Sequence, residues 1–443
     1  MFHDGTIQLG DNVANKNLTK AKQAKKDEFY TQWVDIEKEV NAYIEFNKNV
    51  FNGKTLLLPA DDPFESNFFK FFATHFNDYG LKKLIATSYD PSPIVNTQLE
   101  LSLFADTNQT REIEQGENHR ISKAYRIELT DVSDFDSDGR INIEDVEAKL
   151  LSEKRKLDLG KKSDILAYLT GDKNPDVKHR FSAGDFRSKE VTRLRDEADV
   201  VITNPPFSLF REFLTWVEPD IRLFSIIGNV NSITYKSVFP LIQDNEIWLG
   251  ESIHSGDREF KVPDTYPLDA TGTRVDDKGN RFIRVKGVRW FTNINHGRRH
   301  QPLALMTMAD NIKFSKHKEV QGHEYSRYDN YDAIEIPYTD AIPSDFNGIM
   351  GVPITFLDKY NPDQFEILGS TQRGTHDRVP DTKKYDDYWE MKQNGELTGS
   401  SGGKTNENAN LCQNDGKKNY FVNKSGRIVQ SAYQRIFIRR KCS

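Results

Sequence analysis

The chain has 443 residues, which is long enough for two or three domains that each bury a hydrophobic core. Its net charge of -6 excludes a protein that coats nucleic acid nonspecifically, but it leaves room for a local basic surface. Its two cysteines are too few for a disulfide framework or for a zinc site built from cysteines.

Two features of the sequence bear on where the protein is located. No stretch of about eighteen apolar residues could span a membrane. The lysine-rich residues 16–26 lack the apolar segment of a signal peptide, so we expect a cytoplasmic protein. Residues 1–25 are polar and without hydrophobic periodicity, and we expect this N-terminal segment to be mobile.

Phe29 and Tyr30 directly precede a helical pattern of apolar residues that continues to residue 44. Two interpretations of this aromatic pair stay open. The two rings either anchor the start of the helix or form one wall of a cofactor pocket.

A short apolar strand is predicted at residues 55–60, followed by an acidic turn and a helix with regularly spaced phenylalanines. This order is typical of how an open α/β sheet begins a nucleotide-type site. Because the turn contains no glycine, it is not a pyrophosphate loop of the glycine-rich kind. Its carboxylates suit an amino group or a ribose, and its polar residues are Asp61, Asp62 and Ser66. A second strand at residues 84–88 also leads to an acid, Asp90.

Residues 105–175 interrupt the alternation of strands and helices and look like an insertion. Within them, residues 134–145 have the spacing of a calcium-binding loop, in which oxygen ligands converge on a hard cation. The loop departs from that pattern at its last position, where a Glu is usual, and residues 125–129 resemble a strand rather than an entering helix. A structural calcium site and a plain Asp-rich turn both stay open. The candidate metal-binding residues are Asp134, Asp136, Asp138, Arg140 and Asp145.

Asp185 and Phe186 lie in a glycine-containing turn that precedes a predicted helix over residues 190–195. In a nucleotide site, Asp185 would accept a hydrogen bond from an adenine amino group, and Phe186 would stack on the ring. The alternative is structural, with Asp185 acting as the N-cap of that helix.

Residues 199–203 form a β-branched apolar run of strand length, and Asn204, Pro205, Pro206 and Phe207 follow it. The two prolines prevent both a longer strand and an immediate helix. Because Asn204 precedes a proline, its backbone is pushed toward an extended conformation. Its amide would then project from the carboxyl end of a buried strand, where ligands bind in open α/β sheets.

This Asn-Pro-Pro-Phe sequence suits a planar substrate with an exocyclic amine. Such an amine is a poor nucleophile, because its lone pair is delocalised into the ring. The side-chain oxygen of Asn204 and the carbonyl of Pro205 would accept its two N–H groups and direct the lone pair at an electrophile. Phe207 would stack on the planar substrate. The alternative is a turn in which Asn204 bonds its own backbone.

Further strands are predicted near residues 222, 247 and 288, so residues 26–300 can form one doubly wound, Rossmann-like α/β domain. Residues 301–443 differ, since they are rich in aromatic residues and glycine, and residues 393–413 predict a mobile loop. Basic residues are concentrated in this region. Phosphate binding and a solvated basic surface explain them equally well. The candidate DNA-binding residues are Arg298, Arg299, Lys417, Lys418, Arg435 and Arg439.

Taken in order, these motifs resemble adenine-specific DNA methyltransferases of the EcoRI methylase type. The resemblance extends over nearly the whole chain from about residue 20. It is carried by residues 29–31, 62–68, 184–187 and 204–207, and by the C-terminal stretches 287–293, 350–357 and 433–439. It departs from most methyltransferases in one feature, which is the absence of a Gly-x-Gly sequence after the first strand.

The resemblance implies S-adenosylmethionine as methyl donor and N6 of adenine in double-stranded DNA as acceptor, with residues 301–443 as a mixed target-recognition region. It implies that Asn204, Pro205 and Phe207 hold the flipped base. The other implied roles are cofactor contacts at Asp185 and Phe186, a methionine-side lining from Phe29, Tyr30, Asp61, Asp62 and Ser66, and a ribose contact at Asp90. Pairing with a restriction endonuclease and a monomeric enzyme are further expectations.

Two alternatives stay open. Asn-Pro-Pro-aromatic sequences also serve methyltransferases that act on RNA or on protein glutamine side chains. A nonenzymatic DNA-binding or anti-restriction protein on a methyltransferase scaffold would explain the missing glycines. Cofactor binding distinguishes the last alternative from the others.

Overall fold

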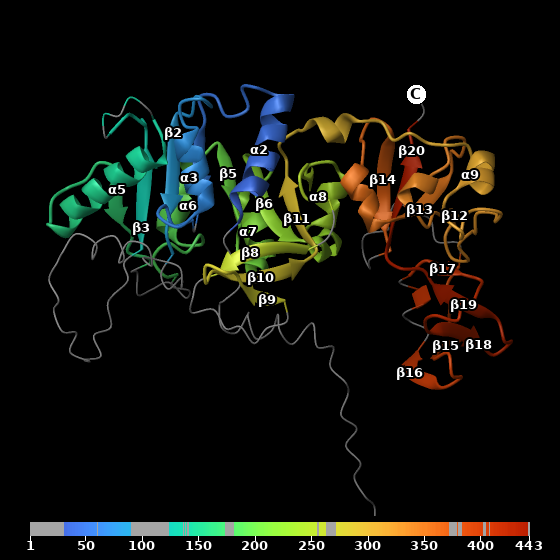
Figure 1. The fold of residues 1–443 in the computed structure, drawn as a ribbon. Helices are drawn as coiled ribbons and strands as arrows, with labels where there is room; N and C mark the ends of the chain where they lie inside the picture. Colours follow the sequence, from blue (N-terminus) through green and yellow to red (C-terminus); the bar gives the residue numbers. More distant parts are fainter. Residues whose placement is uncertain are drawn as a thin grey trace, which may run out of the picture. The chain divides into compact units, whose positions relative to one another are not determined.

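The computed structural model describes residues 31–59, 61–89, 124–135, 137, 139, 141–172, 181–254, 257–262, 272–371, 379, 383–401, 405–406 and 408–441 (Figure 1). The predictions for residues 1–25 and for Phe29, Tyr30, Asp90, Asp136, Asp138 and Arg140 lie outside these residues. Within the described part, no helix is long and apolar enough to cross a membrane.

Contacts within the chain divide it into two compact units. The first contains Met1–Val230 and Ser252–Ile294, and the second contains Asn231–Glu251 and Asn295–Ser443. The predicted catalytic region (26–300) overlaps the first unit without coinciding with it, because residues 231–251 cluster with the second unit.

The first unit is organised around a mixed sheet with strand order β4-β3-β2-β1-β5-β6-β11. The central strands β2, β1, β5 and β6 are mutually parallel, whereas β3, β4 and β11 pair in antiparallel fashion with their neighbours. The predicted α/β fold is thus confirmed, and part of the predicted insertion extends the sheet as β3 and β4. The strands are β1 (Thr55–Leu58), β2 (Lys83–Thr87), β3 (Tyr125–Leu129), β4 (Leu166–Tyr168), β5 (Val200–Thr203), β6 (Leu223–Asn229) and β11 (Val288–Thr292).

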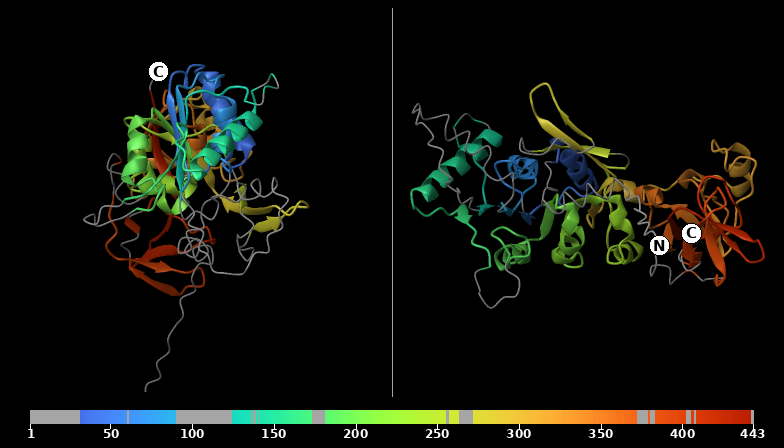
Figure 2. Two further views of the ribbon diagram at one scale, coloured as in Figure 1. Left: turned by 90° about the vertical axis from the view of Figure 1, so that its left-hand side faces the viewer. Right: turned by 90° about the horizontal axis from the view of Figure 1, so that it is seen from below.

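Helices cover both faces of this sheet, with α2 and α3 (blue) on one face and α6 and α7 (green) on the other (Figure 2). Side-chain caps set two of the helix starts, since Ser66 caps α3 and Ser188 caps α6. The helices are α2 (Trp33–Phe46), α3 (Asn67–Thr74), α5 (Ile143–Asp158), α6 (Lys189–Glu197) and α7 (Phe210–Val217).

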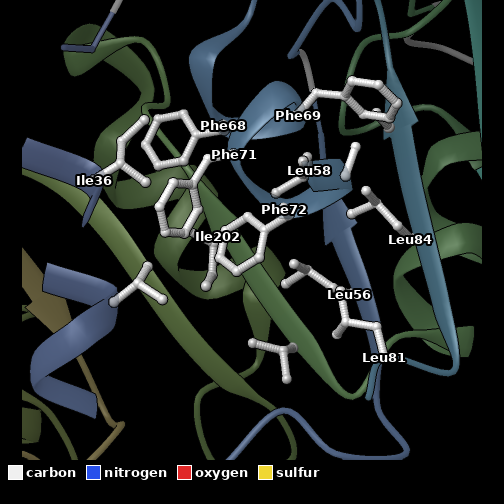
Figure 3. Packing of buried hydrophobic residues seen from close by; sticks show 14 of the residues in the cluster. Ile36, Leu56, Leu58, Phe68, Phe69, Phe71, Phe72, Leu81, Leu84 and Ile202 are labelled. Carbon is white, nitrogen blue, oxygen red and sulfur yellow. The ribbon is translucent and has the colours of Figure 1, made fainter. Parts of the chain in front are cut away.

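The core of the first unit is built from the phenylalanines of α3. All four are buried, and the ring of Phe72 lies beside Ile202 of β5 and Leu56 of β1 (Figure 3). The rings of Phe71 and Phe72 meet edge to face, with 5.3 Å between their centroids. This packing holds α3, and therefore the acidic turn before it, against the central strands.

A separate ribbon of three strands, in the order β8-β10-β9, also belongs to the first unit. It precedes β11 in the chain, and Figure 2 shows it in yellow. Its strands are β8 (Asp257–Val262), β9 (Thr273–Val275) and β10 (Arg281–Lys286).

The second unit contains two small sheets, ordered β12-β13-β20-β14 and β16-β15-β18-β19-β17. The prediction of a mobile loop at residues 393–413 is wrong for part of that segment, because β16 and β17 form there and pair with β15 and β19. The elements are β7 (Trp248–Leu249), α8 (Phe239–Gln243), α9 (Met308–Phe314), β12 (Ala333–Glu335), β13 (Ile349–Pro353), β14 (Phe365–Ser370), β15 (Tyr388–Met391), β16 (Leu397–Ser401), β17 (Asn410–Leu411), β18 (Tyr420–Asn423), β19 (Ile428–Ser431) and β20 (Arg435–Arg440).

We expect Phe72→Ala to lower the free energy of unfolding by about 3–5 kcal/mol, because it opens a cavity in this core. Phe46→Ala is the matched control, since Phe46 is 45% exposed at the end of α2. Urea denaturation followed by circular dichroism measures both variants. Equal losses of stability in the two variants would contradict the assignment of Phe72 to the core.

Candidate active site

The turns after β1 and β5 meet at one edge of the sheet. The two strands are parallel and in register, with Leu56 opposite Val200, so both carboxyl ends lie at the same edge. The single hydroxyl proton of Thr203 is shared between two acceptors, Oδ2 of Asp61, at 2.5 Å, and the carbonyl oxygen of Pro59, at 3.1 Å. This buried pair of contacts joins the acidic turn to the start of the Asn-Pro-Pro-Phe segment.

Asn204 is the first residue after β5, as predicted. Its side chain is half-buried, and the following Pro205 is buried. Pro206 is the N-cap of a short 3₁₀ helix, Phe207–Leu209, which leads directly into α7. Phe207 is partly buried and packs against the hydrophobic core of the first unit. The segment is therefore held at the sheet edge from both sides, by β5 and by α7.

The acidic turn after β1 is internally braced. Ser66 is buried, and its Oγ accepts from the backbone N–H of Phe68, at 3.1 Å, which caps α3. The same hydroxyl donates to Oδ1 of Asp61, at 2.9 Å. Asp61 therefore bonds to Ser66 through one carboxylate oxygen and to Thr203 through the other.

Asp62 differs from Asp61, because one of its carboxylate oxygens has no hydrogen-bond partner among the residues that the structure describes. Oδ1 accepts from the backbone N–H of Phe64, at 2.9 Å, and from the hydroxyl of Tyr125, at 2.7 Å. Oδ2 is buried and accepts no hydrogen bond from any described residue. Burial raises the pKa of Asp62 to about 6, in spite of the two hydrogen bonds that lower it. A buried acceptor of this kind is costly unless a ligand supplies the missing donor.

Asp185 and Phe186 lie next to the end of β2. The carboxylate of Asp185 accepts two hydrogen bonds from the guanidinium of Arg187. Nε donates to Oδ1, at 2.9 Å, and Nη2 donates to Oδ2, at 2.8 Å. Phe186 is buried against Phe213 and Trp216, with centroid separations of 5.0 and 5.4 Å. The alternative that Asp185 caps the following helix is wrong, because Ser188 is the N-cap. The cofactor roles of Asp185 and Phe186 stay predictions.

Gly184 fixes the position of this turn. Its φ is +79°, and a Cβ added here would lie 1.9 Å from the carbonyl oxygen of Ser88, just after β2. No other residue type allows such a close approach of two backbone segments. The turn that carries Asp185 therefore meets the same edge of the sheet as the turn after β1.

The calcium hypothesis is not supported. Among the described residues there is no cluster of His, Cys, Asp or Glu that could hold a metal ion. Both oxygens of Asp145 accept backbone N–H groups, from Phe135 at 2.7 Å and from Asn142 at 2.8 Å. Asp145 and Asn142 thus form a capping box at the start of α5, and the last acid of the loop serves a helix.

The predicted DNA-binding residues of the second unit fall into two groups. Arg299 is buried with its guanidinium over the ring of Trp248, at 3.6 Å, and burial lowers its pKa to about 10. Arg435 is buried in an ion pair with Glu335. Exposure is greater for the rest of the set, namely Arg298, Lys417, Lys418 and Arg439. Their DNA contacts stay predictions.

Three residues of the site were missed at the level of sequence. Tyr125 begins β3 and reaches Asp62, although it lies 63 residues away. Thr203 and Gly184 join neighbouring turns. For Thr203 and Gly184, the only indication in the sequence was their position, since Thr203 ends a predicted strand and Gly184 directly precedes Asp185. For Tyr125, nothing in the sequence identifies its partner.

Comparison with known proteins adds the family. Residues 17–441 match the family described as adenine-specific methyltransferase EcoRI. The chain belongs to this family. It is therefore an adenine-specific DNA methyltransferase, and this decides against the RNA, glutamine and nonenzymatic alternatives.

Individual relatives agree with this family. The chain is 38% identical to the type II methyltransferase M.EcoRI of Escherichia coli, over 81% of this chain and 90% of that protein. It is 30% identical to M.MpnI of Mycoplasma pneumoniae and to M.MgeORF184P of Mycoplasma genitalium. These matches cover 79% and 80% of this chain, and 84% and 85% of those proteins. No solved structure is significantly similar to the chain.

Membership of this methyltransferase family implies S-adenosylmethionine as the methyl donor. The turn after β1 fits such a cofactor, because the unsatisfied oxygen of Asp62 can accept a hydrogen bond from an ammonium or a hydroxyl. The turn has carboxylates rather than a glycine-rich phosphate loop, which suits a donor without phosphate groups.

We expect Asp62→Asn to stabilise the protein at pH 7.5 while weakening cofactor binding. The raised pKa means that between pH 4 and 6 the unfolded chain loses this proton before the folded protein does, so stability falls as pH rises. Two pKa units correspond to about 3 kcal/mol. The new amide leaves a buried group unpaired at a cost of about 1 kcal/mol, which gives a net gain of about 2 kcal/mol.

Urea denaturation at pH 4 and pH 7.5 measures the stability, and calorimetry measures S-adenosylmethionine binding. Asp78→Asn is the control, since the Asp78 side chain is exposed in the turn before β2. Unchanged stability at pH 7.5 together with normal cofactor affinity would contradict the role of Asp62.

Proposed function

We propose that the chain transfers a methyl group from S-adenosylmethionine to N6 of an adenine flipped out of double-stranded DNA, and that Asn204–Phe207 hold this base. The observation that carries the proposal is the position of Asn204 directly after β5. There the bonds of Thr203 connect it to the acidic turn after β1.

The acceptor side of the site follows from the chemistry of the base. The side-chain oxygen of Asn204 and the carbonyl of Pro205 accept the two N–H groups of the adenine amine. Phe207 stacks on the ring and Pro206 fixes the turn, so the amine is oriented before reaction. A strong general base is not needed before transfer, because the amine proton becomes acidic once nitrogen carries the methyl.

The donor side is formed by the turns after β1 and β2. When bound, S-adenosylmethionine would supply a methyl group on a positively charged sulfur: the amine nitrogen would form a bond to the methyl carbon as the sulfur–carbon bond breaks, and neutral S-adenosylhomocysteine would leave. Asp62 accepts a donor group of the cofactor at its unsatisfied oxygen, and Asp61 and Ser66 keep this turn in place. The remaining assignments are Phe29 and Tyr30 on the methionine side, Asp90 at the ribose, and Asp185 with Phe186 at the adenine.

DNA contacts are proposed for the exposed cations of the second unit, Lys417 and Arg439, together with Arg298 and Lys418. Arg299 and Arg435 act indirectly, because their burial makes them supports for the segments that carry the exposed residues. M.EcoRI is named a type II methyltransferase, and by analogy we propose that this enzyme protects DNA from a cognate restriction endonuclease, acting as a monomer.

The decisive experiment is modified-base sequencing of DNA from cells that express the protein. We expect N6-methyladenine at one fixed position of a short sequence, because a type II enzyme methylates its own site. DNA without this base, while the protein is folded and expressed, would overturn the proposal.

We expect Asn204→Ala to lose at least about 100-fold in methylation rate, because it removes an oriented acceptor of the reacting amine. Stability and DNA affinity should be unchanged, since Asn204 is half-buried at the end of a strand. Asn49→Ala, in the exposed turn before β1, is the matched control. Near-normal methyl transfer by Asn204→Ala would sink the role assigned to it.

A further inference from the structure

The ribbon β8-β10-β9 presents a cationic face that the proposed function leaves unused. In an antiparallel pair, residues directly opposite each other point to the same face. Lys286 lies opposite Asp257, Arg284 opposite Glu259, and Phe282 opposite Lys261. Arg274 of β9 lies opposite Phe282 and so joins the same face.

The other face of the ribbon is covered by the body of the first unit. Phe260 and Val262 are buried, and Ile283 and Val285 pack against the hydrophobic core. Arg258, also on this inner face, forms an ion pair with Asp35 of α2, at 3.6 Å. The face with Lys286 and Lys261 therefore points away from the body.

Carboxylates neutralise only part of this outer face. Glu259 pairs with Arg274, and Asp257 pairs with Arg284 at 2.8 Å. Lys261 and Lys286 are exposed, and neither forms an ion pair with any described residue. The face thus carries an excess of two positive charges in a protein whose net charge is -6.

The base of the ribbon lies at the edge of the sheet that carries Asn204. Val288, at the start of β11, is opposite Asn229, the last residue of β6. The side-chain amide of Asn229 donates to the carbonyl oxygen of Lys286, at 2.9 Å. Because β6 is parallel to β5, its carboxyl end lies at the same edge as the Asn-Pro-Pro-Phe segment.

We propose that the outer face of this ribbon binds the phosphates of double-stranded DNA beside the target adenine, an inference that rests on the proposed function. A protein of net negative charge repels DNA unless cations are concentrated where the duplex lies. Lys286 lies four residues along β10 from Phe282, the partner of Lys261, so the two unpaired cations are about 14 Å apart along the ribbon. At this separation they can contact two phosphates of one duplex. Such contacts position DNA without reading its sequence.

The test compares two double charge reversals in the full-length protein. Lys261→Glu with Lys286→Glu removes the unpaired cations of the ribbon. Lys48→Glu with Lys82→Glu changes the net charge equally at the opposite edge of the sheet, where both lysines are exposed just before β1 and β2. Fluorescence anisotropy with a short random-sequence duplex, over a series of salt concentrations, measures affinity.

We expect the ribbon variant to bind DNA at least about tenfold more weakly than the control at low salt. The negative slope of log affinity against log salt concentration should become shallower by about 2. Cofactor affinity and the methylation rate at saturating DNA should match those of the unmodified protein. Equal affinities of the two double variants would overturn the inference. Failure of the proposed function is a different result, because the unmodified protein would then methylate no DNA.

Discussion

The hydroxyl of Thr203 makes the bonds on which the arrangement of the site depends. By donating to Pro59 and Asp61, it connects the turns that follow two parallel strands. Parallel pairing brings the carboxyl ends of β1 and β5 to one edge, and these bonds then fix how the acidic turn lies against Asn204. In the proposed function these two turns hold the methyl donor and the acceptor base, and their fixed relation would align the two molecules for transfer.

Asp62 lowers the stability of the folded protein. The core of α3 phenylalanines stabilises the first unit, whereas a buried carboxylate with one unsatisfied oxygen destabilises it. The hydrogen bonds from Phe64 and Tyr125 offset part of this penalty and orient the free oxygen. A ligand that donates a hydrogen bond to that oxygen would remove the rest of this free-energy penalty. The same oxygen therefore lowers the stability of the unliganded protein and favours ligand binding.

Cationic residues in this protein serve two different purposes. Arg299 and Arg435 are buried against Trp248 and Glu335, where a planar guanidinium can stack or form a fixed ion pair. Exposed lysines, such as Lys286 and Lys417, keep their charge at the surface. A count of basic residues along the chain cannot separate these groups, because burial decides which charges a DNA phosphate can reach.

The sequence by itself determined the α/β class, the strand that ends at Asn204 and the burial of the α3 phenylalanines, because these follow from local patterns of apolar residues and proline. It also determined the family, through motifs in a fixed order. Only the tertiary structure decided that Tyr125 bonds to Asp62, that Asp185 is paired with Arg187 and that Asp145 completes the capping box of α5. It also decided that residues 397–401 form a strand, because pairing with β15 overrides a composition rich in glycine and serine. In each case a partner or a neighbouring strand fixes the role, and the spacing of residues along the chain does not specify it.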